Sequence, residues 1–203
     1  MKYIEYFDDS KINENFKNSF IVSAIAMTLL SSCSVLHHKK HKEEIVVKDK
    51  EELSEIDNAN IPALPKGNII SNYFEQNKGK LPWPVLKGKI TNKFGYYNMG
   101  KVTLNNNGVD IITNENTKIY SVFTGVVSKV FDVCGEPCII ITHDEHYYTV
   151  YTGFKIVKVK QGEKVNARTM LGISKKNINF QVWYKSKKVS KPMAVDPLKF
   201  VSK

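Results

Sequence analysis

The chain has 203 residues, of which 42% are hydrophobic and 11% aromatic. This length suits one domain with a hydrophobic core and is too short for a multidomain enzyme, and the composition excludes a disordered or collagen-like chain. Lys and Arg total 30 against 20 Asp and Glu, and the net charge of +10 favours an anionic partner. Three cysteines are too few for a small fold built on disulfides.

An apolar run, FIVSAIAMTLL, occupies residues 20–30. As a helix it would span about 16 Å, roughly half the ~30 Å core of a bilayer, so it has the length of a signal-peptide core rather than of a transmembrane helix. It ends in LSSC at 30–33, which resembles the lipobox of bacterial lipoproteins. We therefore predict a signal peptide over 1–32 and a lipid anchor on Cys33. The alternative is a buried helix that ends in a cysteine.

The charge around this segment is unusual for a signal peptide. Residues 1–19 contain three lysines and four acidic residues, whereas a typical signal peptide begins with a clearly positive region. A mature chain that starts at Cys33 has 27 basic and 16 acidic residues, a net charge of +11. Because export separates the protein from nucleic acid, we expect no nucleic-acid partner.

Residues 33–75 are predicted to form a flexible tether. The charged run at 37–44 contains His37, His38 and His41, and we interpret it as a solvated stalk rather than a weak metal site. A short helix is conceivable at 48–56, but the prolines and glycine that follow would end it. As flexible coil, the segment 34–75 would span roughly 36 Å, which would let a lipid-anchored domain contact a layer outside the membrane.

Residues 76–203 predict a compact all-β domain, an antiparallel sandwich or barrel. Short segments rich in Val, Ile, Tyr, Phe and Thr alternate with turns such as Asn107-Gly108, and no long stretch has a period of 3.6 residues. The expected strands are 101–104, 109–113, 118–123, 125–133, 138–143, 147–154, 156–160 and 178–184.

Cys134 and Cys138 flank a three-residue turn between two of these expected strands. In an oxidising compartment we favour a disulfide that closes this hairpin, worth on the order of 2 kcal/mol because the loop is small. The alternative is a pair of free, buried thiols.

A series of short motifs follows one order along residues 80–200. They are LPWPV (81–85), GKI (88–90), FG (94–95), GVDI (108–111), IYSVFTGVV (119–127), IIITH (139–143), YYTVY (147–151), VKQGEKV (159–165), MLG (170–172), NFQVW (179–183) and DPL (196–198). This succession resembles the lysostaphin-type (LytM-like) zinc endopeptidases, a duplicated-hybrid-motif β domain whose active members cut peptide cross-links in bacterial peptidoglycan. The LPWPV opening also resembles the EnvC and NlpD proteins of cell division.

The resemblance implies a zinc site in active members. There, a His-x-x-x-Asp segment and the second His of a His-x-His segment hold one Zn²⁺, and water takes the fourth position. Two further histidines act on that water and on the developing oxyanion. In this chain Asp110 matches the aspartate ligand, but Asn106 and Asn179 stand at the two histidine ligand positions, and Gly153 and Asn177 stand at the catalytic positions.

These replacements imply a degenerate member that is not an enzyme and uses no cofactor. A neutral amide is a poor zinc ligand and does not move protons near neutral pH. We interpret His143 and His146, the only histidines of the domain, as ordinary surface residues rather than a metal-binding pair. We expect Asn106, Asp110 and Asn179 to converge in the former zinc pocket, where amides can hydrogen-bond the carboxylate.

The persisting groove predicts a binding function. The candidate groove residues are Asn106, Asp110, Asn177, Asn179 and Trp183. The alternative for the asparagines is a role as turn residues, which suits Asn105 and Asn107 better than the residues beside a strand. For Trp183 the alternative is a place in the core.

Three functions remain open at this point. We favour a lipid-anchored protein of the bacterial cell envelope that binds and activates a peptidoglycan amidase, the role that the resemblance to EnvC and NlpD implies. The second is a peptidoglycan-binding module that uses its positive charge and the exposed aromatic candidates Tyr96, Tyr97 and Trp183. The third is an active zinc endopeptidase with unusual ligands.

Overall fold

The computed structural model describes residues 61–189 and 191–203. The signal peptide, Cys33 and the first part of the tether, which the sequence predicts, therefore lie outside the described residues. Within the described residues, no helix is long and apolar enough to cross a membrane.

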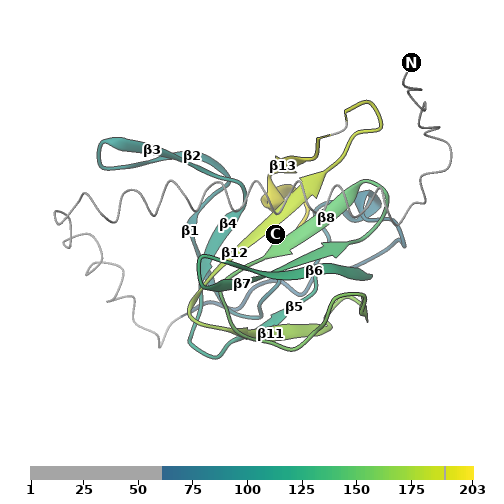
Figure 1. The fold of residues 1–203 in the computed structure, drawn as a ribbon, viewed down its shortest axis with the longest axis horizontal. Coiled ribbons are helices and arrows are strands. Elements are labelled where there is room, and N and C mark those ends of the chain that lie inside the picture. The colour runs from purple at the N-terminus through teal and green to yellow at the C-terminus, as the bar shows by residue number, and fades with distance from the viewer. Residues whose placement is uncertain (1–60, 190) are drawn as a thin grey trace, which may run out of the picture.

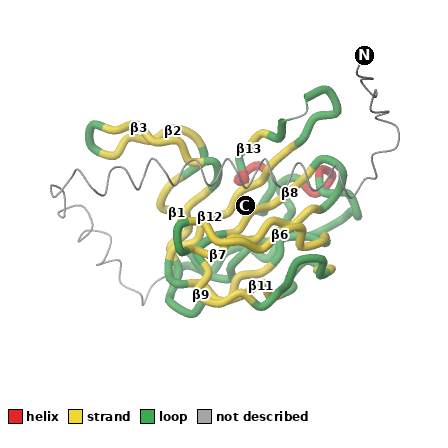
Figure 2. The backbone as a smooth tube through the Cα atoms, viewed as in Figure 1, coloured by secondary structure: helices red, strands yellow, loops and turns green. Residues whose placement is uncertain are grey.

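Regular structure in these residues is almost entirely strand, with two helical turns of three residues each (Figure 2). The elements are η3 (Glu75–Asn77), β1 (Lys89–Asn92), β2 (Gly95–Met99), β3 (Val102–Asn106), β4 (Val109–Ile112), β5 (Lys118–Tyr120), β6 (Gly125–Val133), β7 (Glu136–Thr142), β8 (Tyr147–Tyr151), β9 (Phe154–Val157), β10 (Lys164–Val165), β11 (Met170–Ser174), β12 (Asn177–Tyr184), β13 (Met193–Val195) and η4 (Pro197–Lys199). The predicted all-β class is confirmed.

The strands form three sheets in which every pairing is antiparallel. The large sheet has the order β1-β4-β12-β8-β7-β6-β10, and β13 pairs with the end of β12. A second sheet has the order β5-β11-β9, and β2 and β3 pair only with each other. This β2–β3 hairpin projects from one side of the domain (Figure 1).

The large sheet has two different faces because side chains alternate along each strand. On β12, Ile178, Phe180 and Val182 enter the main hydrophobic core, together with side chains of the second sheet such as Ile119 and Leu171. The opposite face carries a smaller apolar cluster and the polar residues of the candidate site. The residues of this smaller cluster are Cys138, Ile140, Tyr148, Val150 and Trp183.

The hairpin between β6 and β7 corrects the predicted disulfide. Its turn consists of only Cys134 and Gly135, with φ of 55° and 81°, the sign pattern of a type I′ hairpin turn. Cys138 therefore lies inside β7, opposite Phe131, and its side chain enters the smaller apolar cluster. Cys138 is a free thiol whose pKa is raised to about 12 by burial, so the Cys134–Cys138 bond is not formed.

The packed chain begins before residue 76, where the sequence placed the start of the domain. Leu64 N–H donates to the Leu86 carbonyl at 2.8 Å. Phe74 is fully buried and its ring stacks on His143 and Tyr147, with centroids 4.7 and 4.9 Å apart. Residues 61–75, assigned to the tether from sequence, thus contact the domain.

His143 is half-buried rather than a surface residue as the sequence suggested. Its Nδ1 lies 2.8 Å from the Thr124 carbonyl oxygen, which can only accept, so Nδ1 carries the proton. Nε2 is then the acceptor for the Thr149 hydroxyl at 2.7 Å. Burial lowers the pKa of His143 to about 4, which keeps the imidazole neutral in the folded protein.

This histidine is expected to make folding less stable in acid. Its folded pKa lies below the ordinary value of 6.5, so between these two values the unfolded chain binds a proton that the folded chain does not. Stability should fall as the pH drops from about 6.5 towards 4, by up to about 3 kcal/mol from this residue. Urea unfolding at pH 7.5 and pH 4.5 measures the loss.

The matched variants are His143→Gln and His146→Gln. The first should lose part of the pH dependence, because the titrating group is gone, whereas the second should keep the wild-type difference between the two pH values. Equal pH dependence in His143→Gln and the wild-type chain would contradict the assignment.

Candidate functional site

The site is built on Asp110 and its neighbours on two adjacent strands. In the sheet register, Asp110 of β4 lies opposite Asn92 of β1 on one side and opposite Asn179 of β12 on the other. Asn106 ends β3 and reaches the same place through a short turn at Asn107 and Gly108. The structure therefore brings Asn106, Asp110 and Asn179 together, as the sequence predicted.

The turn at Gly108 explains how Asn106 comes so close to β12. A Cβ atom at residue 108 would lie 2.3 Å from the carbonyl oxygen of Phe180, which is backbone and cannot move aside cheaply. Only glycine allows this approach. The Gly108 N–H also donates to Asn106 Oδ1 at 3.0 Å, which holds that side chain beside Asp110.

Three amide groups donate to the Asp110 carboxylate. Asn179 Nδ2 donates to Oδ1 at 2.6 Å, and Asn106 Nδ2 and Asn92 Nδ2 donate to Oδ2 at 3.3 and 3.0 Å. Asn179 Nδ2 also donates to Asn106 Oδ1 at 3.0 Å. The carboxylate is thus held by N–H groups, and an N–H group forms a stronger hydrogen bond to an anion than to a neutral acceptor.

The orientation of these amides follows from one buried indole. Trp183 Nε1–H can only donate, and it donates to Gln181 Oε1 at 2.7 Å. Gln181 therefore directs Nε2 to Asn179 Oδ1, 2.8 Å away, which leaves Asn179 Nδ2 to face Asp110. Because each group in this series donates to the next, the oxygen and nitrogen of the Gln181 and Asn179 amides can be assigned in only one way.

Trp183→Phe is expected to loosen this arrangement. The change keeps an aromatic ring in the apolar cluster but removes the one donor that the described residues offer to the buried Gln181 side-chain carbonyl, which should lower the free energy of unfolding by about 1–3 kcal/mol. Urea unfolding measures the loss, and the side-chain amide NMR signals of Asn179 should shift. Tyr184→Phe, a hydroxyl deletion on the neighbouring residue, is the control and should leave those signals in place.

The two catalytic positions also lack the chemistry that the resemblance implies for active members. Asn177 is exposed at the start of β12 and carries a neutral amide. Gly153 has φ of +85°, and a Cβ there would lie 2.0 Å from the backbone oxygen of Asn177. A side chain at residue 153 therefore requires the backbone of β12 to move.

An open pocket of about 540 Å³ lies over this region. Its lining residues are Lys89, Ile90, Thr91, Asn92, Asp110, Glu136, Thr152, Asn177, Ile178 and Asn179. Of the predicted groove residues, Asp110, Asn177 and Asn179 line the pocket, and Asn106 lies behind them, 8% exposed. Trp183 does not line it; at 3% exposed it supports the amides from the smaller apolar cluster.

The donor set does not fit Zn²⁺. Of the three ligand positions only Asp110 offers an anionic oxygen, while both asparagines turn N–H groups towards the place where a metal would bind. No group of three or more His, Cys, Asp and Glu that could hold a metal occurs within 61–189 and 191–203. Both ring nitrogens of His143 are hydrogen-bonded, to Thr124 and Thr149. His146 Nδ1 lies 3.0 Å from the Lys185 carbonyl oxygen.

Sequence reasoning missed two contributors to the site, Gln181 and Asn92. Gln181 continues the alternation of amides at 177 and 179 along β12, and this pattern was the signal that could have found it. Asn92 gave no signal, because its place beside Asp110 depends on the β1–β4 register. Tyr97, which the sequence suggested as an exposed aromatic, is half-buried on the projecting hairpin, and burial and the charge of Asp110 both raise the pKa of its phenol. Tyr96, by contrast, is 82% exposed.

Comparisons with known proteins find relatives of this fold. Residues 104–191 match the model of peptidase family M23. Csd3 of Helicobacter pylori is similar in structure, with a TM-score of 0.51 and 22% identity over 61% of this chain and 35% of the Csd3 chain. A chain in the complex of SpoIIIAH and SpoIIQ has a TM-score of 0.50 and 18% identity over 60% of this chain and 100% of its own.

A further structure, the catalytic domain of the antimicrobial peptidase lysostaphin from Staphylococcus simulans, has a TM-score of 0.47 and 22% identity over 56% of this chain and 91% of its own. No curated protein sequence matches the chain. The match to Csd3 spans about a third of that protein.

Proposed function

Because residues 104–191 belong to peptidase family M23, we propose that this protein uses the family's fold to bind rather than to cut. It is a non-catalytic protein of the bacterial cell envelope whose pocket binds a peptidoglycan amidase and activates it. The lipobox at 30–33 supports attachment to a membrane through a lipid on Cys33.

One observation carries this proposal. The positions that would hold zinc are filled by amides whose N–H groups are directed at Asp110, and the donor-only indole of Trp183 decides that direction. A site arranged in this way satisfies its carboxylate without a metal, while the pocket above it stays open. An open, polar pocket without a reactive centre supports a binding role.

An amidase assay tests the proposal. The full chain is mixed with an N-acetylmuramoyl-L-alanine amidase from the same organism and with dye-labelled sacculi, and the release of dye is followed. The expected result is faster release in the presence of the chain and no release by the chain alone. If the full chain neither binds the amidase nor changes its rate, the activator function is wrong.

A pocket variant makes this assay specific. Asn177→Arg places a large charged side chain at the exposed edge of the pocket and should abolish activation. Glu145→Arg is the control: this exposed residue precedes the start of β8, whereas Thr152 of the pocket follows the end of the same strand. Activation should survive Glu145→Arg. Elemental analysis of the same preparation should find no stoichiometric zinc.

A second candidate is a peptidoglycan-binding module without an enzyme partner. Residues 61–203 contain 22 basic and 9 acidic residues, a net charge of +13, which favours an acidic, sugar-rich polymer. The exposed ring of Tyr96 could add a contact to sugar. Under this alternative the full chain sediments with sacculi in the absence of amidase, and high salt releases it.

A further inference from the structure

Residues 68–80 form a closed loop that is held firmly on the domain. The two ends meet where the Asn68 N–H donates to the Lys80 carbonyl at 2.7 Å. Inside the loop, the buried side chain of Asn77 makes four hydrogen bonds to the backbone, and Phe74 inserts its ring into the main core. Because its interior is filled and hydrogen-bonded, this loop presents its exposed side chains in a fixed arrangement.

The exposed side chains of this loop include three large apolar ones. Ile69, Ile70 and Tyr73 are all exposed. The backbone of this segment takes part in the hydrogen bonds of the loop, for example the Ile70 N–H to Asn77 Oδ1 at 2.8 Å, but the fold does not bury these side chains. Apolar side chains that gather on an exposed surface mark an interaction site, whereas isolated ones need no explanation. The loop therefore offers an apolar surface to a partner.

Lysines surround this apolar surface. The C-terminal segment lies beside the loop, since the Leu81 N–H donates to the Phe200 carbonyl at 3.1 Å. Residues 66–81 and 198–203 contain five exposed lysines and one acidic side chain, Glu75, which pairs with one of the lysines at 3.0 Å. The lysines are Lys66, Lys78, Lys80, Lys199 and Lys203. The charge of this face favours an anionic partner.

We propose that this face docks on an anionic lipid bilayer, with Ile69, Ile70 and Tyr73 at the level of the headgroups and the lysines beside lipid phosphates. At this boundary the isoleucine side chains leave water, and an amphipathic tyrosine keeps its hydroxyl among polar groups. Each lysine near such a surface adds attraction to anionic lipids. A hydrated wall polymer would pair with the lysines but would leave both isoleucines in water, so the lipid surface is the better match.

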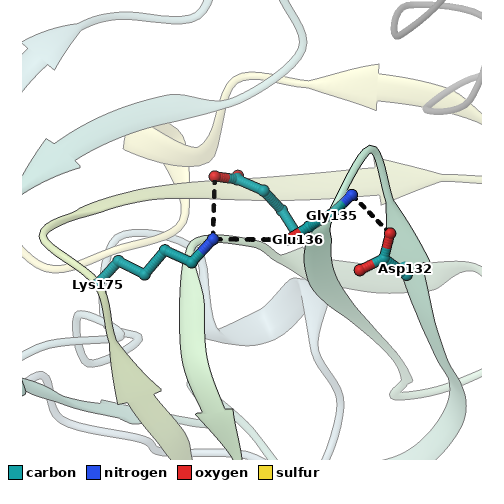
Figure 3. A network of polar contacts seen from close by, with 4 residues as sticks. All are labelled: Asp132, Gly135, Glu136 and Lys175. Carbon is teal, nitrogen blue, oxygen red and sulfur yellow. Dashed lines mark hydrogen bonds and ion pairs between the residues drawn. The ribbon is translucent and has the colours of Figure 1, made fainter.

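The pocket lies at the other end of the sheet and stays open when this face is docked. Phe74 stacks on Tyr147, the first residue of β8, whereas Thr152 of the pocket follows the last residue of that strand. The five residues of β8 span roughly 17 Å. The ion pair of Glu136 and Lys175 belongs to the pocket end (Figure 3). The proposal rests on the proposed function for its place in the cell envelope, and it turns the pocket away from the membrane.

A tryptophan introduced at residue 73 tests the contact directly. The full-length Tyr73→Trp chain is mixed with vesicles of equimolar phosphatidylglycerol and phosphatidylcholine whose acyl chains carry bromine, which quenches tryptophan fluorescence on contact. The apolar run at 20–30 can itself attach the chain to vesicles, so quenching is compared at equal bound fractions, measured by sedimentation. The wild-type chain, in which Trp83 and Trp183 are buried, gives the background.

The expected result is strong quenching of the new tryptophan on anionic vesicles and weak quenching on vesicles of phosphatidylcholine alone. Tyr96→Trp is the matched control, because Tyr96 is also an exposed tyrosine but lies on the β2–β3 hairpin, across the domain from η3 (Figure 1). It should be quenched no more than the wild-type chain. Absent quenching at residue 73, equal quenching at residue 96, or equal quenching on neutral vesicles would each overturn the proposal.

Two pairs of lysine variants test the charge. In the Tyr73→Trp chain, Lys78→Gln with Lys80→Gln should lower the ratio of docked to undocked protein about tenfold, since two attractions to anionic lipid are lost. Lys175→Gln with Lys176→Gln also removes two charges and one exposed ion pair, but at the pocket end (Figure 3). This second pair should change the ratio less than about twofold. An equal effect of both pairs would contradict docking through this face.

Other partners give different results. If the fluorescence of the Tyr73→Trp chain responds to lipid-free sacculi or to the amidase but not to vesicles, the face binds wall or protein and the proposal is wrong. The amidase assay contains no vesicles. Lost activation with quenching intact therefore refutes the proposed function alone, and activation without quenching refutes only the docking proposal.

Discussion

Replacing Asn106 and Asn179 by histidine is expected to turn this chain into a stoichiometric zinc-binding protein. Both side chains already contact Asp110, at 3.3 and 2.6 Å, so two imidazoles at these positions would stand beside one carboxylate. Two histidines and one carboxylate are a sufficient set of protein ligands for Zn²⁺, with water in the fourth position. We expect one zinc per double variant and none in the wild-type chain.

Elemental analysis after dialysis and competition with a chromophoric chelator measure the stoichiometry and affinity. The matched control is Asn105→His with Asn177→His, which adds two imidazoles near the same region but not at the ligand positions. Equal zinc in this control and in the Asn106→His, Asn179→His variant would show that the three positions do not converge as a metal site. Since Gln181 Nε2 would lose its acceptor, the histidine variant should also be slightly less stable.

Zinc binding by this variant should not restore hydrolysis of the wall. The catalytic positions remain Gly153 and Asn177, and neither can take up or donate a proton near neutral pH. Gly153→His cannot be added without cost, because the new Cβ would lie 2.0 Å from the Asn177 carbonyl in a backbone conformation that favours glycine. The difference from the pattern that the resemblance implies for active members thus lies in the side chains at residues 106 and 179 and in the backbone at residue 153.

Asn77→Asp is expected to lower the free energy of unfolding strongly, although it changes only one terminal group of the side chain. Asn77 is fully buried, and its side chain makes four hydrogen bonds to the backbone. Oδ1 accepts from the N–H groups of Ile70 and Ser71, and Nδ2 donates to the carbonyl oxygens of Ser71 and Tyr73. Aspartate has no donor for these two carbonyls and would bring a buried negative charge to face them.

The expected loss is roughly 3–5 kcal/mol, because two buried acceptors lose their donor and a charge is left without a partner. Urea unfolding of the full chain at pH 7.5 measures it. Asn72→Asp is the control, since Asn72 is exposed in the same loop and should cost less than about 0.5 kcal/mol. A small effect of Asn77→Asp would mean that the loop before η3 does not contribute to the fold, and that Phe74 is held by the core alone.

At the positions where the resemblance implies a zinc site, the structure places three amides around one carboxylate. Asp110, which matches the aspartate ligand position of active members, is the charged member of an amide cluster. The pocket above it is open, and the surrounding domain carries a net charge of +13. These properties are the basis of the proposed binding function.

The sequence alone was enough to predict the antiparallel all-β class and the replacement of the zinc ligands. Both depend on local information. Alternating β-forming residues predict strands one segment at a time. The motifs around Asp110 and Asn179 align these positions with the family pattern without knowledge of any contact. The convergence of Asn106, Asp110 and Asn179 followed from the resemblance. Short strands such as β10 and β13 were missed because two or three residues carry no period.

Only the tertiary structure decided the rest, since it depends on which residues far apart in sequence become neighbours. Asn92 joins the site through the β1–β4 register, and Trp183 controls the amides through Gln181 although nothing in its sequence context distinguishes it from a core aromatic. Cys138 was expected in a disulfide but lies inside a strand because the hairpin turn has two residues. Phe74 was expected in a tether, but Asn77 folds its loop onto the core. Hydrogen bonds and burial reward three-dimensional proximity, which composition and local pattern do not encode.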